Sequence, residues 1–144
     1  MSTADQAQIL YPVAALMLLV VLITVLMLRE RVQEMKARRI HPKKVASSTQ
    51  MAAVLQNTRA ADNYKNLFEM PMLFVACCLA LLATQSVTPL FLGLAWGYVA
   101  LRLVHSFIHV GYNNVMHRFN VFALSALVLL VMWVLLVFQL LQRS

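Results

Sequence analysis

The stretch ILYPVAALMLLVVLITVLML, residues 9–28, decides the fold because it holds twenty consecutive residues without a charge. Twenty helical residues at about 1.5 Å each span about 30 Å, the thickness of the hydrocarbon core of a bilayer. Three further apolar stretches follow, at residues 64–84, 90–110 and 120–141. The sequence therefore predicts an all-α membrane protein, a four-transmembrane-helix bundle with up-down-up-down topology.

The composition supports lipid as the solvent of this chain. Of its 144 residues 62% are hydrophobic and only 12% are charged, whereas a soluble domain carries about 25% charged residues. No segment between the apolar stretches is long enough for a second folded unit. We therefore expect a single membrane domain, residues 1–144, with a basic loop at residues 29–63.

The net charge of +7 is concentrated in one part of the chain. Nine of the twelve lysines and arginines lie between Arg29 and Lys65, whereas the connection Thr84–Pro89 carries no charge. The positive-inside rule then places the basic loop in the cytoplasm and both termini on the non-cytoplasmic side. Such a loop is attracted to anionic lipid headgroups. No basic motif interleaved with aromatic residues accompanies it, so we expect no nucleic-acid partner.

Local signals refine the helices. Glu34 and Arg38 have the i,i+4 spacing of a surface ion pair on a helix that continues past the membrane. Ser47 and Gln50 have the spacing of a capping box and predict a short helix that follows them. Pro71 should kink the second transmembrane helix.

Polar side chains form two stripes in this apolar background. On the second helix Asp62, Asn66 and Glu69 fall within an arc of about 60°. On the third helix a 4-3-4-3 spacing places five polar residues within roughly 80° of one another: Tyr98, Arg102, His105, His109 and Tyr112. Such a stripe would not face lipid, so we expect a polar cluster inside the bundle, completed by Arg118 at the start of the fourth helix.

The residues alone leave several roles open for this cluster. Glu69 and Arg102 could form an ion pair that fixes the bundle, with the histidines as hydrogen-bonding partners. Glu69 and the histidines could instead line a proton or ion pathway. His105 and His109 share one face but lack a clear third ligand, so we expect no metal site.

With these residues laid out, the chain resembles the MAPEG family, the membrane-associated proteins in eicosanoid and glutathione metabolism. The segment Asn66-Leu67-Phe68-Glu69-Met70-Pro71 is similar to the Asn-x-x-Glu and proline of the family's second helix. Arg102-x-x-His105-x-x-x-His109, with Arg118 sixteen residues after Arg102, is similar to the prostaglandin E synthase branch. The resemblance covers nearly the whole chain, and we expect a bacterial-type member in the bacterial inner membrane.

The resemblance implies a homotrimer that binds glutathione between subunits at the cytoplasmic side. Arg118 would be the catalytic arginine that favours the thiolate, the nucleophilic form of sulfur. Glu69 would accept from a glutathione amine or backbone group, and Arg29 or Arg31 would bind a carboxylate. The implied glutathione-binding residues are Arg29, Arg31, Lys65, Asn66, Glu69, Arg102, His105 and His109.

Four departures from the branch separate the functional hypotheses. Lys65 stands where the branch has arginine, His109 where it has tyrosine and Phe119 where it has serine, and Glu69 lies closer to Pro71. A catalytic member would be a glutathione-dependent transferase or peroxidase acting on a lipophilic small molecule from the membrane lipids. A non-catalytic member would be a trimeric lipid-binding or accessory scaffold protein. A third hypothesis is a small proton-coupled carrier that uses Glu69.

Overall fold

The computed structural model describes residues 3–41, 45 and 47–143. Of the described residues 83% are helical, and none of them lies in a strand. Four helices in this part of the chain are long and apolar enough to cross a membrane, which confirms the predicted all-α membrane class. Lys43 and Lys44 of the basic loop lie outside the described residues.

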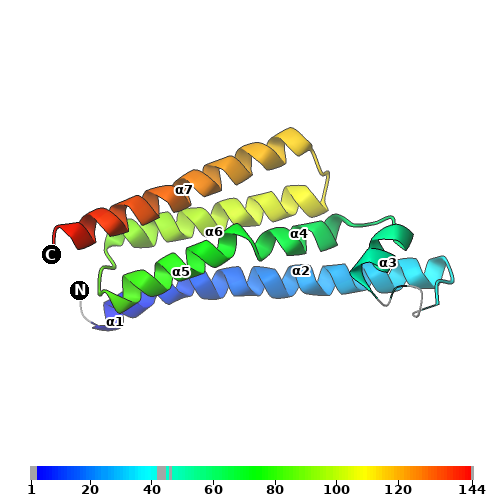
Figure 1. Ribbon diagram of the computed structural model, residues 1–144, viewed down its shortest axis with the longest axis horizontal. Helices are drawn as coiled ribbons and strands as arrows, with labels where there is room; N and C mark the ends of the chain where they lie inside the picture. The colour runs from blue at the N-terminus through cyan, green and yellow to red at the C-terminus, as the bar shows by residue number, and fades with distance from the viewer. Residues whose placement is uncertain (1–2, 42–44, 46, 144) are drawn as a thin grey trace.

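The long helices lie side by side along one axis (Figure 1). In chain order the elements are α1 (Thr3–Gln6), the 3-10 turn η1 (Ala7–Ile9), α2 (Leu10–Ala37), α3 (Ser48–Val54), α4 (Arg59–Leu67), α5 (Met70–Ala83), α6 (Pro89–Val110) and α7 (Val115–Leu141). Both termini lie at the end of the bundle that holds the α5–α6 turn, which we call the termini end. The α6–α7 turn and α3 lie at the opposite end, which we call the loop end.

The predicted basic loop is largely helical. α2 continues nine residues past Leu28, to Ala37, because nothing in that segment breaks a helix. The predicted capping box at the start of α3 is confirmed. Ser47 Oγ accepts from the Gln50 N–H at 3.2 Å, and Gln50 Oε1 accepts from the Ser47 N–H at 3.2 Å.

The second transmembrane helix is broken rather than gently kinked. α4 ends at Leu67 and α5 begins at Met70, with Pro71 in the first turn of α5. Proline has no N–H for the carbonyl of Leu67, and its ring clashes with that carbonyl in a continuous helix. The break therefore follows from Pro71, as the sequence predicts.

The core is apolar and is built by all four transmembrane elements. Its fully buried members come from η1, α2, α4, α5, α6 and α7, and include Leu16, Phe74, Leu81, Tyr98, Met132 and Leu136. Phe74 stacks on Tyr98 with ring centroids 4.4 Å apart. α6 packs along α7, and α2 packs against α4 and α6. The contacts of α6 with α2, α4 and α7 make it the central element of the loop end.

Side-chain bonds to backbone tie the termini end together. The Gln6 side chain donates to Val87 O at 3.2 Å and accepts from the Val87 N–H at 3.0 Å. Arg143 Nη1 donates to Thr84 O and to Ser86 Oγ, each at 3.0 Å. Both ends of the chain are thereby held on the α5–α6 turn.

The α6–α7 turn at the loop end depends on one glycine. A Cβ on Gly111 would lie 2.8 Å from the carbonyl oxygen of Phe107, closer than real Cβ atoms approach. Asn113 follows with a positive φ of 52°, which asparagine tolerates better than most residues. The Asn114 side chain then caps α7 by accepting from the backbone N–H of Met116 and of His117.

Gly111→Ala should therefore destabilise the protein by about 1–3 kcal/mol, the usual cost of forcing an atom into filled space. Gly97→Ala is the matched control, because a Cβ there meets nothing within 4 Å and alanine favours a helix interior by about 0.5–1 kcal/mol. Thermal unfolding in detergent measures both. Equal midpoints for the two variants would contradict the close approach at Gly111.

Candidate functional site

The polar stripe predicted on the third helix lies inside the bundle. Tyr98, Arg102, His105 and His109 are at most 3% exposed. Tyr112 lies beyond the end of α6, is 57% exposed, and shares a 3.1 Å hydrogen bond with His117 Nδ1. We call the buried residues Asn63, Tyr98, Arg102, Ser106, His105 and His109, together with the half-buried Arg118, the polar cluster.

Arg102 joins α6 to the end of α4. Its Nη2 donates to the backbone carbonyl of Asn66 at 3.1 Å. Asn66 lies in the last turn of α4, where carbonyls lack partners within the helix and the negative end of the helix dipole favours a cation. The guanidinium carbon also lies 5.7 Å from the centroid of the Phe122 ring of α7, a cation–π distance. The fully buried guanidinium thus caps the helix that Pro71 interrupts.

The two histidines join α6 to the start of α7 through Arg118. His105 Nδ1 lies 3.2 Å from the carbonyl oxygen of Arg118, and His109 Nε2 lies 3.1 Å from Arg118 Nη1. A carbonyl only accepts and a guanidinium only donates. His105 therefore carries its proton on Nδ1, and a neutral His109 also carries its proton on Nδ1. Arg118 Nη1 donates in addition to Asn113 Oδ1 at 2.9 Å.

A second buried pair belongs to the polar cluster and was missed by the spacing argument. Ser106 Oγ donates to Asn63 Oδ1 at 3.3 Å, and both residues are at most 2% exposed. Ser106 lies four residues after Arg102 and so on the same face of α6, which is the signal that could have found it. Asn63 follows Asp62 directly in the sequence and is not a member of the predicted stripe of Asp62, Asn66 and Glu69.

Several buried polar atoms of the cluster have no hydrogen-bond partner within the described part of the chain. They are Asn63 Nδ2, Tyr98 Oη, Arg102 Nε and Nη1, His105 Nε2 and His109 Nδ1. All of these except His105 Nε2 are donors in the protonation states deduced above. Buried donors without acceptors are costly, so the polar cluster is suited to an electron-rich or anionic group.

The expected ion pair between Glu69 and Arg102 is wrong. Glu69 is exposed, and Glu34–Arg38 is the ion pair found among the described residues. The physical reason is the helix break, since Glu69 lies between α4 and α5 with a non-helical ψ of −101°. The 4-3 spacing from Asp62 therefore no longer projects Glu69 onto the face of Asn66.

The structure separates the two arginines at the end of α2. Arg31 lines a small pocket of about 100 Å³ together with Asp62 and Lys65 of α4. Arg29 is exposed and does not line this pocket. Side chains two positions apart on a helix differ by about 200° in direction, which accounts for the separation of Arg29 and Arg31. Of the two sequence candidates, Arg31 lies with Lys65.

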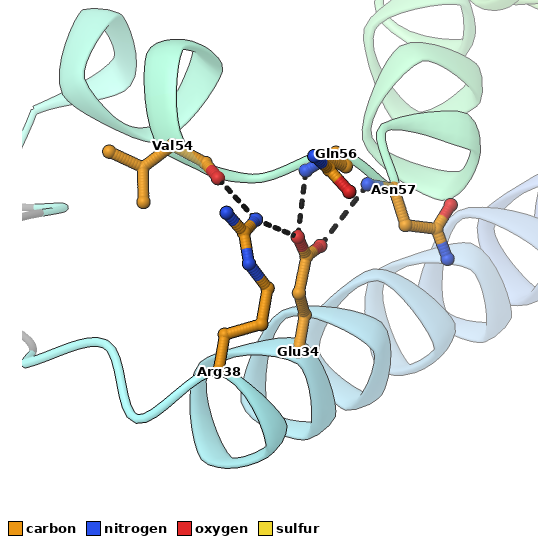
Figure 2. Close-up of polar contacts among 5 residues, drawn as sticks. All are labelled: Glu34, Arg38, Val54, Gln56 and Asn57. Carbon is orange, nitrogen blue, oxygen red and sulfur yellow. Dashed lines mark hydrogen bonds and ion pairs between the residues drawn. The ribbon is translucent and has the colours of Figure 1, made fainter.

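Glu34 binds backbone at the loop end (Figure 2). Its carboxylate forms the predicted ion pair with Arg38 at 2.7 Å. The same carboxylate accepts from the backbone N–H groups of Gln56 at 2.8 Å and Asn57 at 3.1 Å. Arg38 Nη1 donates to Val54 O at 2.6 Å. The pair therefore fixes the connection between α3 and α4, which carries Lys65 and Asp62 toward the small pocket.

One comparison with known proteins identifies a family. The sequence model of the MAPEG family matches residues 9–138 of the 144-residue chain. No curated protein and no solved structure matches the chain.

Glu34→Ala should speed the hydrogen exchange of the Gln56 and Asn57 amides several-fold, because each loses its acceptor and local opening becomes easier. Gln33→Ala, an exposed neighbour on α2, is the matched control and should leave both rates unchanged. Exchange measured by mass spectrometry on the detergent-purified protein reports both variants. Unchanged protection of residues 55–58 in Glu34→Ala would show that the carboxylate does not hold this connection.

Proposed function

The chain belongs to the MAPEG family. From this premise we propose that it binds glutathione and transfers it, through its sulfur, to a lipophilic electrophile. The proposed assembly is a homotrimer of up-down-up-down bundles with the site between subunits. The observation that carries the proposal is the polar cluster, whose unpaired donors surround a buried guanidinium at the loop end of the bundle. Glutathione brings two carboxylates, peptide carbonyls and a thiolate, all of which accept from such donors.

Each part of glutathione has a matching group in this proposal. The pocket of Arg31 and Lys65 offers two cations for a carboxylate, and an arginine can bind it with two parallel bonds. The exposed Glu69 would accept from the amine. Arg118 would hold the sulfur as thiolate by charge, since the thiolate is the nucleophile. The sulfur then forms a bond to the electrophilic carbon while the leaving group departs with its electron pair.

The position of Glu69 supports the proposed homotrimer. An ionised side chain costs about 2.5–3.5 kcal/mol at the centre of a membrane helix and less toward the ends. Glu69 is exposed on the surface of one chain and lies between the transmembrane segments α4 and α5. A neighbouring subunit and a ligand that covers Glu69 would remove this carboxylate from lipid.

The proposed orientation puts the loop end in the cytoplasm, where glutathione is available, and both termini on the far side of a bacterial inner membrane. The termini end suits that placement because the polar side chains of Gln6 and Arg143 form internal hydrogen bonds there. In particular, Arg143, a positive charge on the proposed non-cytoplasmic side, is bound to the α5–α6 turn. The lipophilic substrate would enter from the bilayer.

Calorimetric titration of the detergent-purified protein with glutathione tests the proposal directly. We expect saturable binding and a thiolate absorbance in the complex. Arg118→Ala should abolish that absorbance and weaken binding about tenfold, the effect of losing one charged hydrogen bond. Arg143→Ala, at an arginine bound to the α5–α6 turn of the termini end, is the control and should retain both signals. The absence of binding at millimolar glutathione would end the proposal.

Arg102→Lys separates binding from folding. Lysine keeps the positive charge and a donor for Asn66 O but loses the planar fork with its additional donors. We expect the thermal midpoint to change little while glutathione affinity falls about tenfold. Arg102→Met, which also removes the bond to Asn66 O, should in addition lower stability by about 1–3 kcal/mol. Unaltered affinity in Arg102→Lys would assign Arg102 to the fold alone.

A non-catalytic lipid-binding or scaffold protein is the second candidate, and one observation favours it. Arg118 is already bound to His109 and Asn113 within one chain, and the neighbouring Phe119 is 60% exposed. Turnover of a soluble test electrophile such as chlorodinitrobenzene with glutathione distinguishes the candidates. A measured turnover that depends on Arg118 supports the transferase, whereas binding without turnover supports the scaffold.

A further inference from the structure

An apolar cleft runs along the outside of the bundle between α2 and α6. Its volume is about 450 Å³, within the range of about 300–1,000 Å³ that is typical of small-molecule sites. Its walls are formed mainly by Leu22, Ile23, Leu26, Leu103, Phe107 and Val110. Leu22 is 55% and Phe107 is 74% exposed, so the cleft opens sideways. In a membrane it opens toward the hydrocarbon chains of lipids.

At the loop end this cleft continues into a polar hollow of about 370 Å³. Val110 lines both, and the hollow adds Glu30 of α2 and Arg59 of α4. Glu30 lies four residues after Leu26 and thus extends the wall of the cleft along the same face of α2. Arg59 Nη1 donates to Gly111 O at 3.0 Å, and Gly111 borders the apolar cleft. Arg59 is therefore fixed where the two spaces meet.

The hollow presents two opposite charges that do not neutralise each other. Neither Glu30 nor Arg59 takes part in an ion pair among the described residues, and Arg59 Nε and Nη2 have no hydrogen-bond partner there. We place both residues at the membrane boundary, because the apolar run of α2 ends at Leu28 and Arg59 is the first residue of the segment that is able to cross a membrane. This is the depth of lipid headgroups, where a charged pair can be met by a headgroup of matching charges.

We propose that the cleft between α2 and α6 and its polar hollow form a binding site for phosphatidylethanolamine. One acyl chain lies along the apolar cleft, the phosphate accepts from Arg59, and the primary ammonium donates to Glu30. Phosphatidylcholine lacks the N–H groups that Glu30 needs, and phosphatidylglycerol lacks the cation. The site borders the polar cluster at Ser106 and does not rest on the proposed thiol chemistry.

The headgroup assignment is tested by lipid retention. The protein is reconstituted into vesicles of equal parts phosphatidylethanolamine, phosphatidylcholine and phosphatidylglycerol, extracted with detergent, and examined by native mass spectrometry. We expect phosphatidylethanolamine to be retained in preference to the other two. Glu30→Gln should remove the preference over phosphatidylcholine, and Arg59→Gln should lower total retention roughly five- to tenfold. Arg143→Gln, at the opposite end, should match wild type.

The acyl-chain assignment has its own matched pair. Leu22→Trp places a large ring in the cleft and should reduce retention, whereas Leu18→Trp adds the same ring at a 71% exposed position outside it and should not. Equal retention in the two tryptophan variants would overturn the site in the cleft. Preferred retention of phosphatidylglycerol, no retained lipid, or a cleft covered by a second copy of the chain would overturn the proposal as well.

Discussion

The hydrogen bond from Arg102 to the carbonyl of Asn66 is the interaction on which the loop end depends. Pro71 interrupts the second transmembrane helix and leaves carbonyls at the end of α4 without partners. Inside a membrane an orphan carbonyl and a buried guanidinium are each costly. Their pairing satisfies the carbonyl and one nitrogen of the guanidinium, and it fixes the register of α6 against α4. That register in turn presents His105 and His109 to the first turn of α7.

The two ends of the bundle satisfy their polar groups differently, and the proposed binding site lies at the end where fewer of these groups are paired. At the termini end the Gln6 side chain matches both backbone groups of Val87, and Arg143 closes on the α5–α6 turn. At the loop end the polar cluster retains several buried donors without acceptors in the described chain. A bundle that needed only stability would replace such donors with apolar side chains. Among the described residues, the buried polar atoms without partners all belong to this cluster, which is typical of a binding site.

Side-chain periodicity predicted what depends on side chains alone. The four transmembrane helices, the buried stripe of Arg102 and its neighbours, and the Glu34–Arg38 pair all follow from spacing on a helix. Spacing could not identify the hydrogen-bond partner of a side chain where that partner is a backbone group. The Asn66 carbonyl that Arg102 meets, and the amides that Glu34 holds, carry no sequence signal. The predicted ion pair of Glu69 with Arg102 was wrong because the helix break before Pro71 turns Glu69 away from the polar stripe.

The charge balance of the polar cluster leaves two arginines without a carboxylate partner among the described residues. Arg102 and Arg118 are both cations at physiological pH, and neither forms an ion pair with a carboxylate in the described residues. Asn113, the Phe122 ring and the dipole of α4 partly stabilise these positive charges, but dipoles and rings do not neutralise charge. An anion that binds there gains from a low surrounding dielectric, because the same attraction is several times stronger than in water. An anionic thiolate is therefore favoured over the neutral thiol wherever the sulfur lies near these two arginines.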